Sequence, residues 1–273
     1  MTIKLAGPLL LVGAGKMGGA LLAGWLERGL DPTCVFVQDP EPPTEALALV
    51  QAHGIACDAA PKPPDAPCVV VLAVKPQIMD IVLPTVASLV GPDTVVLSIA
   101  AGRTIASLQA HLGEGTAIVR SMPNTPAAIG RGITVAHSNS AVTPNQAERC
   151  IALLSAVGEV AWVDDEALLD PVTAVSGSGP AYVFLLTECL AEAGVEAGLD
   201  EDLARRLARA TVSGAAELMR QSETEPATLR QNVTSPGGTT AAALQVLMDE
   251  AGLQQLMTRA VAAAAERSRD LSA

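Results

Sequence analysis

The architecture of this chain follows from its residues 9–18, Leu9-Leu10-Leu11-Val12-Gly13-Ala14-Gly15-Lys16-Met17-Gly18. A short apolar run, typical of a buried strand, leads directly into three glycines spaced Gly-x-Gly-x-x-Gly. A helical pattern then runs from Met17 to Arg28 and stops at Gly29. In such a unit the first glycine permits a tight turn, the second lets the backbone approach a pyrophosphate, and the third allows close helix–strand packing. The pattern predicts a dinucleotide-binding turn.

The acidic residue that accompanies such turns is Asp39, which ends the second predicted strand, Cys34–Gln38. A carboxylate there accepts a hydrogen bond from a ribose 2′-hydroxyl and repels a 2′-phosphate. No arginine follows Asp39 within sixty residues to bind a 2′-phosphate, and Lys16 is expected to face solvent or the pyrophosphate. The local chemistry favours NADH and leaves NADPH open.

The rest of the first half alternates strand and helix signals. Thr44 is expected to cap a short helix that stops at Gly54, residues 58–67 read as a loop, and another helix begins near Pro144. Further strands are expected at Cys68–Val74, Val95–Ser98, Ala117–Arg120, Ile133–His137 and Val160–Val163. This alternation predicts an α/β fold with a mostly parallel, doubly wound sheet over residues 1–164.

Strand signals vanish after about residue 165, where Ala, Leu, Glu and Arg dominate. We expect an all-helical domain over residues 165–273. Its helices should lie at 180–197, 201–221, 226–232, 239–250 and 253–270. Few of their residues are bulky, so mutual burial in an oligomer is a reasonable hypothesis.

Composition narrows the class of protein. Of the 273 residues 49% are hydrophobic and only 2% aromatic, which suits closely packed helices and buried parallel strands. The net charge of −12 repels nucleic acid and anionic membranes. No apolar run reaches the roughly 18 residues of a membrane span, and the N-terminus reads as a strand, not as a signal peptide. Five scattered cysteines without metal-ligand spacing indicate reduced thiols, no metal site and a cytoplasmic protein.

A polar, glycine-rich loop separates two of the predicted helices, with the sequence Asn232-Val233-Thr234-Ser235-Pro236-Gly237-Gly238-Thr239-Thr240. A helix begins at Thr239, and helix N-termini and consecutive backbone amides bind anions. Two hydroxyl pairs, an asparagine and two glycines exceed what an interhelix turn requires. The loop therefore predicts a site for a small carboxylic acid.

The helical half has neither lysine nor histidine. A dehydrogenase that oxidises an alcohol normally needs His, Lys or Tyr to move the alcohol proton, and this half offers only Tyr182. A cyclic imine is partly protonated near neutrality, and its iminium carbon accepts hydride directly. The enzyme then needs to position the substrate with polar groups more than it needs a strong base. The composition thus favours C=N over C=O reduction. Lys75 is the one lysine suited to chemistry, and it equally serves as part of a strand-closing turn.

Two further features allow more than one interpretation. The segment Ser176-Gly177-Ser178-Gly179-Pro180-Ala181-Tyr182 opens a helix, and it is equally explained by capping or by a close approach of backbone to ligand. Glu166 is explained more simply as a solvated acid than as a partner for a substrate nitrogen.

Together these residues resemble the pyrroline-5-carboxylate reductase family along essentially the full chain. The glycine turn is unspecific, whereas 176–182 and 232–240 are highly specific to that family. The other matching segments are Ala73-Val74-Lys75-Pro76, Ala100-Ala101-Gly102 and Met122-Pro123-Asn124-Thr125-Pro126.

The resemblance implies reduction of L-1-pyrroline-5-carboxylate to L-proline, the last step of proline biosynthesis, by NADPH or NADH. It implies a Rossmann-type domain followed by a helical dimerisation domain, with dimers that assemble further, often into decamers. The cofactor would contact Gly13, Ala14, Gly15, Lys16, Met17, Gly18, Asp39, Ala73, Val74, Lys75, Pro76, Ala100, Ala101, Gly102 and Asn124. The substrate would contact Glu166, Ser176, Asn232, Ser235, Gly237, Gly238, Thr239 and Thr240, and the proton would arrive with the substrate, through Thr240 or through water.

The chain departs from the family at two positions. Many members have a small hydroxyl residue where Asp39 stands, and an asparagine where this chain has Ala59-Ala60-Pro61, which leaves cofactor preference open. The alternatives are a β-hydroxyacid dehydrogenase, whose usual lysine in the helical domain is missing here, and a non-catalytic nucleotide-binding protein. Piperideine carboxylates, one methylene larger, remain possible substrates.

Overall fold

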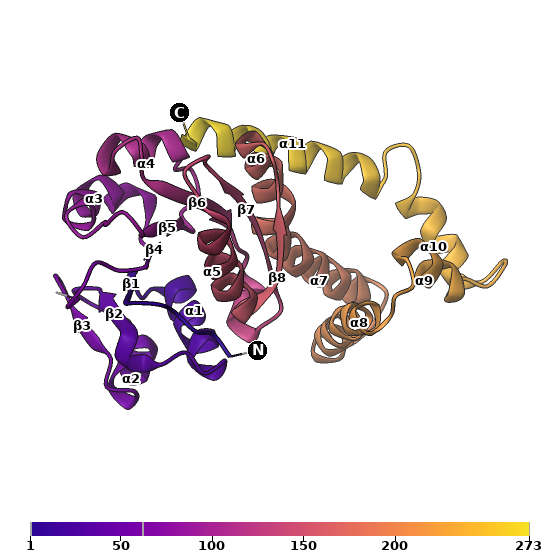
Figure 1. The fold of residues 1–273 in the computed structure, drawn as a ribbon. Coiled ribbons are helices and arrows are strands. Elements are labelled where there is room, and N and C mark those ends of the chain that lie inside the picture. The colour runs from indigo at the N-terminus through magenta and orange to yellow at the C-terminus, as the bar shows by residue number, and fades with distance from the viewer. Residues whose placement is uncertain (1, 62, 273) are drawn as a thin grey trace. The chain divides into compact units, whose positions relative to one another are not determined.

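The computed structural model describes residues 2–61 and 63–272. The chain forms two compact units, one of Met1–Gly177 together with Ala264–Ala273, and one of Ser178–Ala263. Each is described by itself (Figure 1).

An eight-stranded sheet forms the centre of the first unit, in the order β3-β2-β1-β4-β5-β6-β7-β8. All neighbouring strands within the described residues are parallel except β6 and β7, which are antiparallel. The strands are β1 Leu9–Val12, β2 Val35–Gln38, β3 Ala56–Asp58, β4 Val69–Leu72, β5 Val95–Ser98, β6 Ala117–Met122, β7 Gly132–Ser138 and β8 Gly158–Trp162. The mostly parallel sheet expected from the sequence is confirmed.

Helices cover both faces of this sheet, which is the doubly wound arrangement (Figure 1). They are α1 Lys16–Glu27, α2 Thr44–Ala52, α3 Met79–Ala87, α4 Ile105–Leu112, α5 Pro144–Leu154 and the short α6 Leu169–Val172. Successive residues of one strand point to opposite faces, so Leu9 and Leu11 pack with α1, α2 and α5, whereas Leu10 and Val12 pack with α3 and α4. Burial on both faces explains why these strands are continuously apolar.

The strand order identifies the edge of the sheet at which a ligand would bind. From β1 the chain winds outward to β2 and β3, then returns to β4 on the other side of β1 and winds outward again to β5 and β6. The winding direction therefore reverses between β1 and β4. In open parallel sheets, ligands bind at the carboxyl ends of the strands at this switch point.

Two local predictions were wrong. Thr44 is the first residue of α2, and Pro43 is the N-cap without a side-chain hydrogen bond. Strand β3 was missed because it has only three residues at the sheet edge, where partial exposure removes the apolar signal. The stop at Gly29 is confirmed, since this residue adopts the left-handed φ of +75° directly after α1.

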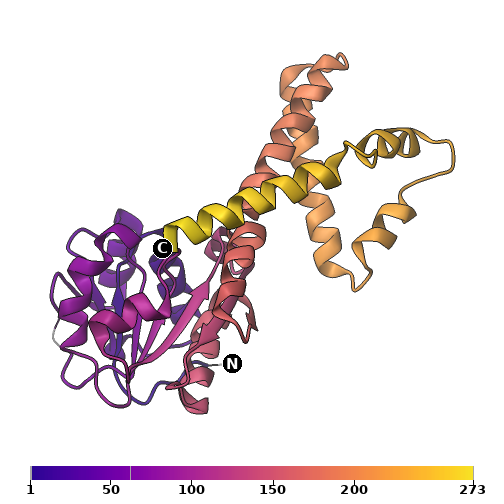
Figure 2. The same cartoon turned by 90° about the horizontal axis from the view of Figure 1, so that it is seen from above.

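In the described residues of the second unit, helices are the only regular secondary structure, as expected. Its helices are α7 Gly179–Glu196, α8 Glu201–Gln221, α9 Pro226–Asn232, α10 Thr239–Leu247 and the first part of α11 Leu253–Ser272, whose end belongs to the first unit. Helices α7 and α8 form a hairpin (Figure 2) in which Gly194 and Ala204 allow close contact. Many large apolar side chains stay exposed on this unit, among them Phe184 at 62%. No helix in the described part of the chain is long and apolar enough to cross a membrane.

Candidate functional site

The glycine turn lies at the switch point, between β1 and α1. Gly13 has a φ of +94°, and a Cβ added to it would lie 2.8 Å from the carbonyl oxygen of Ala73. A Cβ on Gly18 would lie 2.2 Å from the carbonyl oxygen of Gly13. A Cβ on Gly15 meets nothing within 4 Å. Gly13 and Gly18 are thus required by packing of the protein on itself, whereas the space over Gly15 is open for a ligand.

Asp39 points back at the same turn from the end of β2. Its Oδ2 accepts from the backbone N–H of Ala14 at 2.7 Å, and its Oδ1 accepts from the N–H of Glu41 at 3.0 Å. These two bonds hold the carboxylate beside the glycine turn. An anion fixed there suits a ribose diol and opposes a 2′-phosphate.

The loops after β4 and β5 continue the same edge of the sheet. Ala73 and Val74 lie directly against Gly13, and Lys75 beyond them is exposed. After β5, the N–H of Ala100 bonds the hydroxyl of Ser98 at 3.3 Å. The segments with predicted nicotinamide contacts therefore lie at the carboxyl ends of adjacent strands.

Asn124 and Ser176, which the sequence assigns to different ligands, are brought together within the first unit. The Asn124 side-chain amide donates to the Ser176 hydroxyl at 3.2 Å, and its oxygen accepts from the N–H of Ile133 at 3.0 Å. Asn124 thereby joins the segment after β6 to the segment that precedes α7. Both residues are half-buried.

Glu166 is engaged with protein groups. Its Oε1 accepts from the backbone N–H of Ile105 at 2.8 Å and from Nη1 of Arg120 at 2.8 Å. The Arg120 side chain is only 6% exposed and that of Glu166 is 27% exposed. The interpretation of Glu166 as a solvated surface acid is therefore wrong.

The predicted carboxylate loop lies in the second unit, between α9 and α10. The N–H of Gly238 bonds the carbonyl of Ser235 at 3.0 Å, and Gly237 has a φ of +68°. Pro236 and Gly237 then occupy the central positions of a type II turn, which needs positive φ at its third residue. This turn delivers the chain into α10, whose N-cap Gly238 has no side-chain hydrogen bond.

The start of α10 therefore leaves donors available. The first amides of a helix have no intrahelical acceptor. Within the described residues, no side-chain hydrogen bond is made by Asn232, Ser235, Thr239 or Thr240. Backbone amides and hydroxyl-bearing residues thus follow one another at the positive end of α10, which suits a carboxylate.

Comparison with known proteins agrees with both halves of this description. Residues 166–271 match the family profile described as pyrroline-5-carboxylate reductase dimerisation, and residues 9–102 match the profile of NADP oxidoreductase, coenzyme F420-dependent. A pyrroline-5-carboxylate reductase of Pseudomonas aeruginosa is 43% identical over 262 residues, which covers 96% of this chain and 95% of that protein. This chain belongs to the pyrroline-5-carboxylate reductase family. The dimerisation profile indicates a homo-oligomer.

Solved structures of this family share the fold. A pyrroline-5-carboxylate reductase from Coxiella burnetii superposes with a TM-score of 0.90 at 34% identity, covering 98% of this chain and all of that one. The Plasmodium falciparum pyrroline carboxylate reductase, solved with NADP bound, has a TM-score of 0.80 at 28% identity, with 98% and 99% coverage. The predicted family, fold class and oxidoreductase class are confirmed, and both NADH and NADPH remain allowed.

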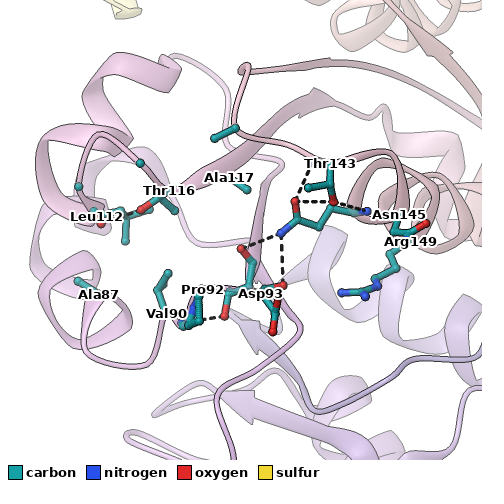
Figure 3. Close-up of a pocket in the computed structure, with 16 residues that line it drawn as sticks. Ala87, Val90, Pro92, Asp93, Leu112, Thr116, Ala117, Thr143, Asn145 and Arg149 are labelled. Carbon is teal, nitrogen blue, oxygen red and sulfur yellow. Dashed lines mark hydrogen bonds between the residues drawn. The ribbon is translucent and has the colours of Figure 1, made fainter.

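A hollow of about 640 Å³ elsewhere in this reductase holds none of the predicted site residues (Figure 3). It lies at the opposite edge of the sheet, where Thr94 and Thr116 precede β5 and β6. Its wall includes Arg149 and Asp93, and Nη1 of Arg149 is buried without a hydrogen-bond partner in the described chain. The switch-point edge, not this hollow, carries the features expected for the family.

Arg120, the partner of Glu166, is a residue whose structural role the sequence alone did not indicate. A strand that reads Ala117-Ile118-Val119-Arg120 places a cation among residues that are otherwise buried and apolar. A buried arginine requires an anionic partner. The need for an anionic partner could have been inferred from the sequence. It could not have identified Glu166 as that partner, because Glu166 lies 46 positions away.

Proposed function

We propose that this protein reduces L-1-pyrroline-5-carboxylate to L-proline with a hydride from NADH or NADPH, the last step of proline biosynthesis. The observation that carries the proposal is family membership over nearly the whole chain, with 43% identity to the Pseudomonas enzyme. The open space over Gly15 and the donor-rich start of α10 support it, because the reaction needs a dinucleotide and a bound carboxylate.

The cofactor would bind along the switch-point edge. The turn from Gly13 to Gly18 would hold the pyrophosphate, and Asp39 would accept a hydrogen bond from the adenosine ribose. The nicotinamide would be bordered by Ala73 to Pro76, Ala100 to Gly102 and Asn124. Since Asp39 is held as an acceptor by two backbone amides, we propose a preference for NADH.

The substrate carboxylate would bind the amides and hydroxyls from Ser235 to Thr240, with Asn232 and Thr240 near the ring and Ser176 nearby. Hydride adds to C5 of the protonated imine, its electron pair forms the new C–H bond, and the C=N π electrons pass to nitrogen. The iminium proton becomes the amine proton, so no strong general acid is required. The proton arrives with the substrate or by way of Thr240 or water.

We further propose that residues 1–164 serve cofactor binding and residues 165–273 serve substrate binding and dimerisation. Dimers would assemble into a higher oligomer such as a decamer, and the enzyme would act in the cytoplasm.

The test is a spectrophotometric assay with pyrroline-5-carboxylate and either NADH or NADPH. Loss of the reduced-nicotinamide absorbance with formation of proline supports the proposal. Folded protein that binds the dinucleotide but oxidises neither form would overturn it in favour of a non-catalytic nucleotide-binding protein. Oxidation with a 3-hydroxy acid and NAD⁺ instead would indicate a β-hydroxyacid dehydrogenase.

A further inference from the structure

The Glu166 carboxylate joins two backbone segments that lie far apart in the sequence. Ile105, which donates its N–H to Oε1, is the first residue of α4 and directly follows the loop 99–104. Arg120, which donates to the same oxygen, lies in β6 opposite Ser98, the last residue of β5. One oxygen atom therefore links the loop after β5 to strand β6 at the carboxyl edge of the sheet.

Both donors need this acceptor. The Ile105 amide is one of the first amides of α4, which have no partner within the helix, and a negative charge there is favourable. Arg120 is 5% exposed, so its guanidinium requires an anion near it. Removing the carboxylate would leave a buried cation and a helix-start amide without their acceptor.

The loop that Glu166 fixes has two further supports. Arg103 forms an ion pair with Asp80 on α3. Gly102, with a φ of +72°, lies so close to α11 that an added Cβ would be 3.0 Å from the carbonyl oxygen of Leu271. The exposed ion pair is weak by comparison, because solvent screens it, and the Glu166 contact is the part-buried one.

We propose that Glu166 is a positioning residue for the nicotinamide-side loop, acting with Arg120, and is not a ligand of the substrate. The proposal rests on the proposed function in placing the nicotinamide beside Ala100 to Gly102. In this role the carboxylate holds the loop in one position at the carboxyl edge of the sheet, where the nicotinamide would bind.

Ligand binding without turnover gives the first test. Glu166→Ala and Arg120→Met should both weaken binding of NADH, measured by fluorescence titration, while binding of ADP-ribose, which lacks the nicotinamide, changes less than about twofold. Asp164→Asn, an exposed acid two residues away, is the matched control and should leave both affinities unchanged. Equal loss for both ligands, or loss for neither, would contradict a role confined to the nicotinamide loop.

Steady-state kinetics give the second test of Glu166 as a positioning residue. Misplacement of the loop should lower kcat by about ten- to a hundredfold, with the KM for pyrroline-5-carboxylate unchanged within about twofold. A raised KM at unchanged kcat would make Glu166 a substrate ligand and overturn the proposal. Combining Arg120→Met with Glu166→Ala should cost no more than Glu166→Ala alone, since the two act as one unit.

Glu166→Gln covers the case in which the alanine variant fails to fold. It keeps an oxygen acceptor for Ile105 and Arg120 but removes the negative charge, so it should fold and lose less kcat than the alanine variant, whereas a ligand for a cationic imine would lose substrate affinity. Inactive wild-type protein would refute the proposed function alone, because the comparison of NADH with ADP-ribose still tests Glu166.

Discussion

At the scale of single residues, the proposed substrate site in the second unit can be tested at the hydroxyls that start α10. Replacing Thr240 with alanine should lower kcat/KM for pyrroline-5-carboxylate about ten- to a hundredfold, because a hydrogen bond to a charged group contributes about 1.5–3 kcal/mol. The midpoint of thermal unfolding should stay the same, since no hydrogen bond to the protein is lost among the described residues. Thr258→Ala, an exposed threonine of α11, is the control. Unaltered kinetics for the Thr240 variant would remove it from the site.

We expect Asp39 to set the preference between the two nicotinamide cofactors. Asp39→Ser removes the negative charge that opposes a 2′-phosphate, and like charges in contact cost several kcal/mol. The ratio of kcat/KM for NADPH to that for NADH should rise by at least about tenfold. The same ratio measured for Glu27→Gln, at the far end of α1, should match the wild type. If both variants leave the ratio alone, Asp39 only supports the Ala14 amide.

At the scale of elements, two glycines of the turn between β1 and α1 have different roles, since Gly18 is required by packing and Gly15 faces open space. Gly18→Ala should lower the free energy of unfolding by about 1–3 kcal/mol, because its methyl would overlap the Gly13 carbonyl. Gly15→Ala should keep that free energy within about 1 kcal/mol, since Gly15 has an ordinary φ of −62° and open space. It should nevertheless weaken NADH binding. Chemical denaturation and fluorescence titration of both variants measure the two effects, and tight binding by Gly15→Ala would exclude a pyrophosphate there.

The elements themselves show what a sequence can predict. The central strands β1, β4 and β5 were found because burial on both faces makes them continuously apolar, and helices such as α8 and α9 were found because Asp, Pro and Gly mark their ends. Strand β3 lacked such a pattern. The pair of Arg120 and Glu166 was not predictable, because it depends on how β6 and the segment before α6 meet in three dimensions.

At the scale of the whole molecule, the exposed apolar side chains of the second unit fit its match to a dimerisation profile. Phe184→Glu on α7 should shift the protein toward monomer, because a charge replaces an apolar side chain that oligomerisation would bury. Light scattering coupled to gel filtration measures the mass. Ile81→Glu, which changes another exposed apolar residue, on α3, should leave the mass unchanged. Wild-type mass for the Phe184 variant would place the interface elsewhere.

The last turns of α11 have a consequence for how the chain folds while the ribosome synthesises it. Ser268 donates to Asp170 at 2.6 Å, and Leu271 packs on Gly102, so the sheet-containing unit is completed by residues made after the whole of Ser178–Ala263. At ribosomal speeds of about 5–20 residues per second, this intervening segment takes roughly ten seconds to translate. During that time the surface around Gly102 stays uncovered, because Leu271 has not yet been synthesised. The loop around Gly102 should therefore gain its contact with α11 only after translation has passed Leu271. Until then, the Glu166 contact and the ion pair of Arg103 with Asp80 are its supports.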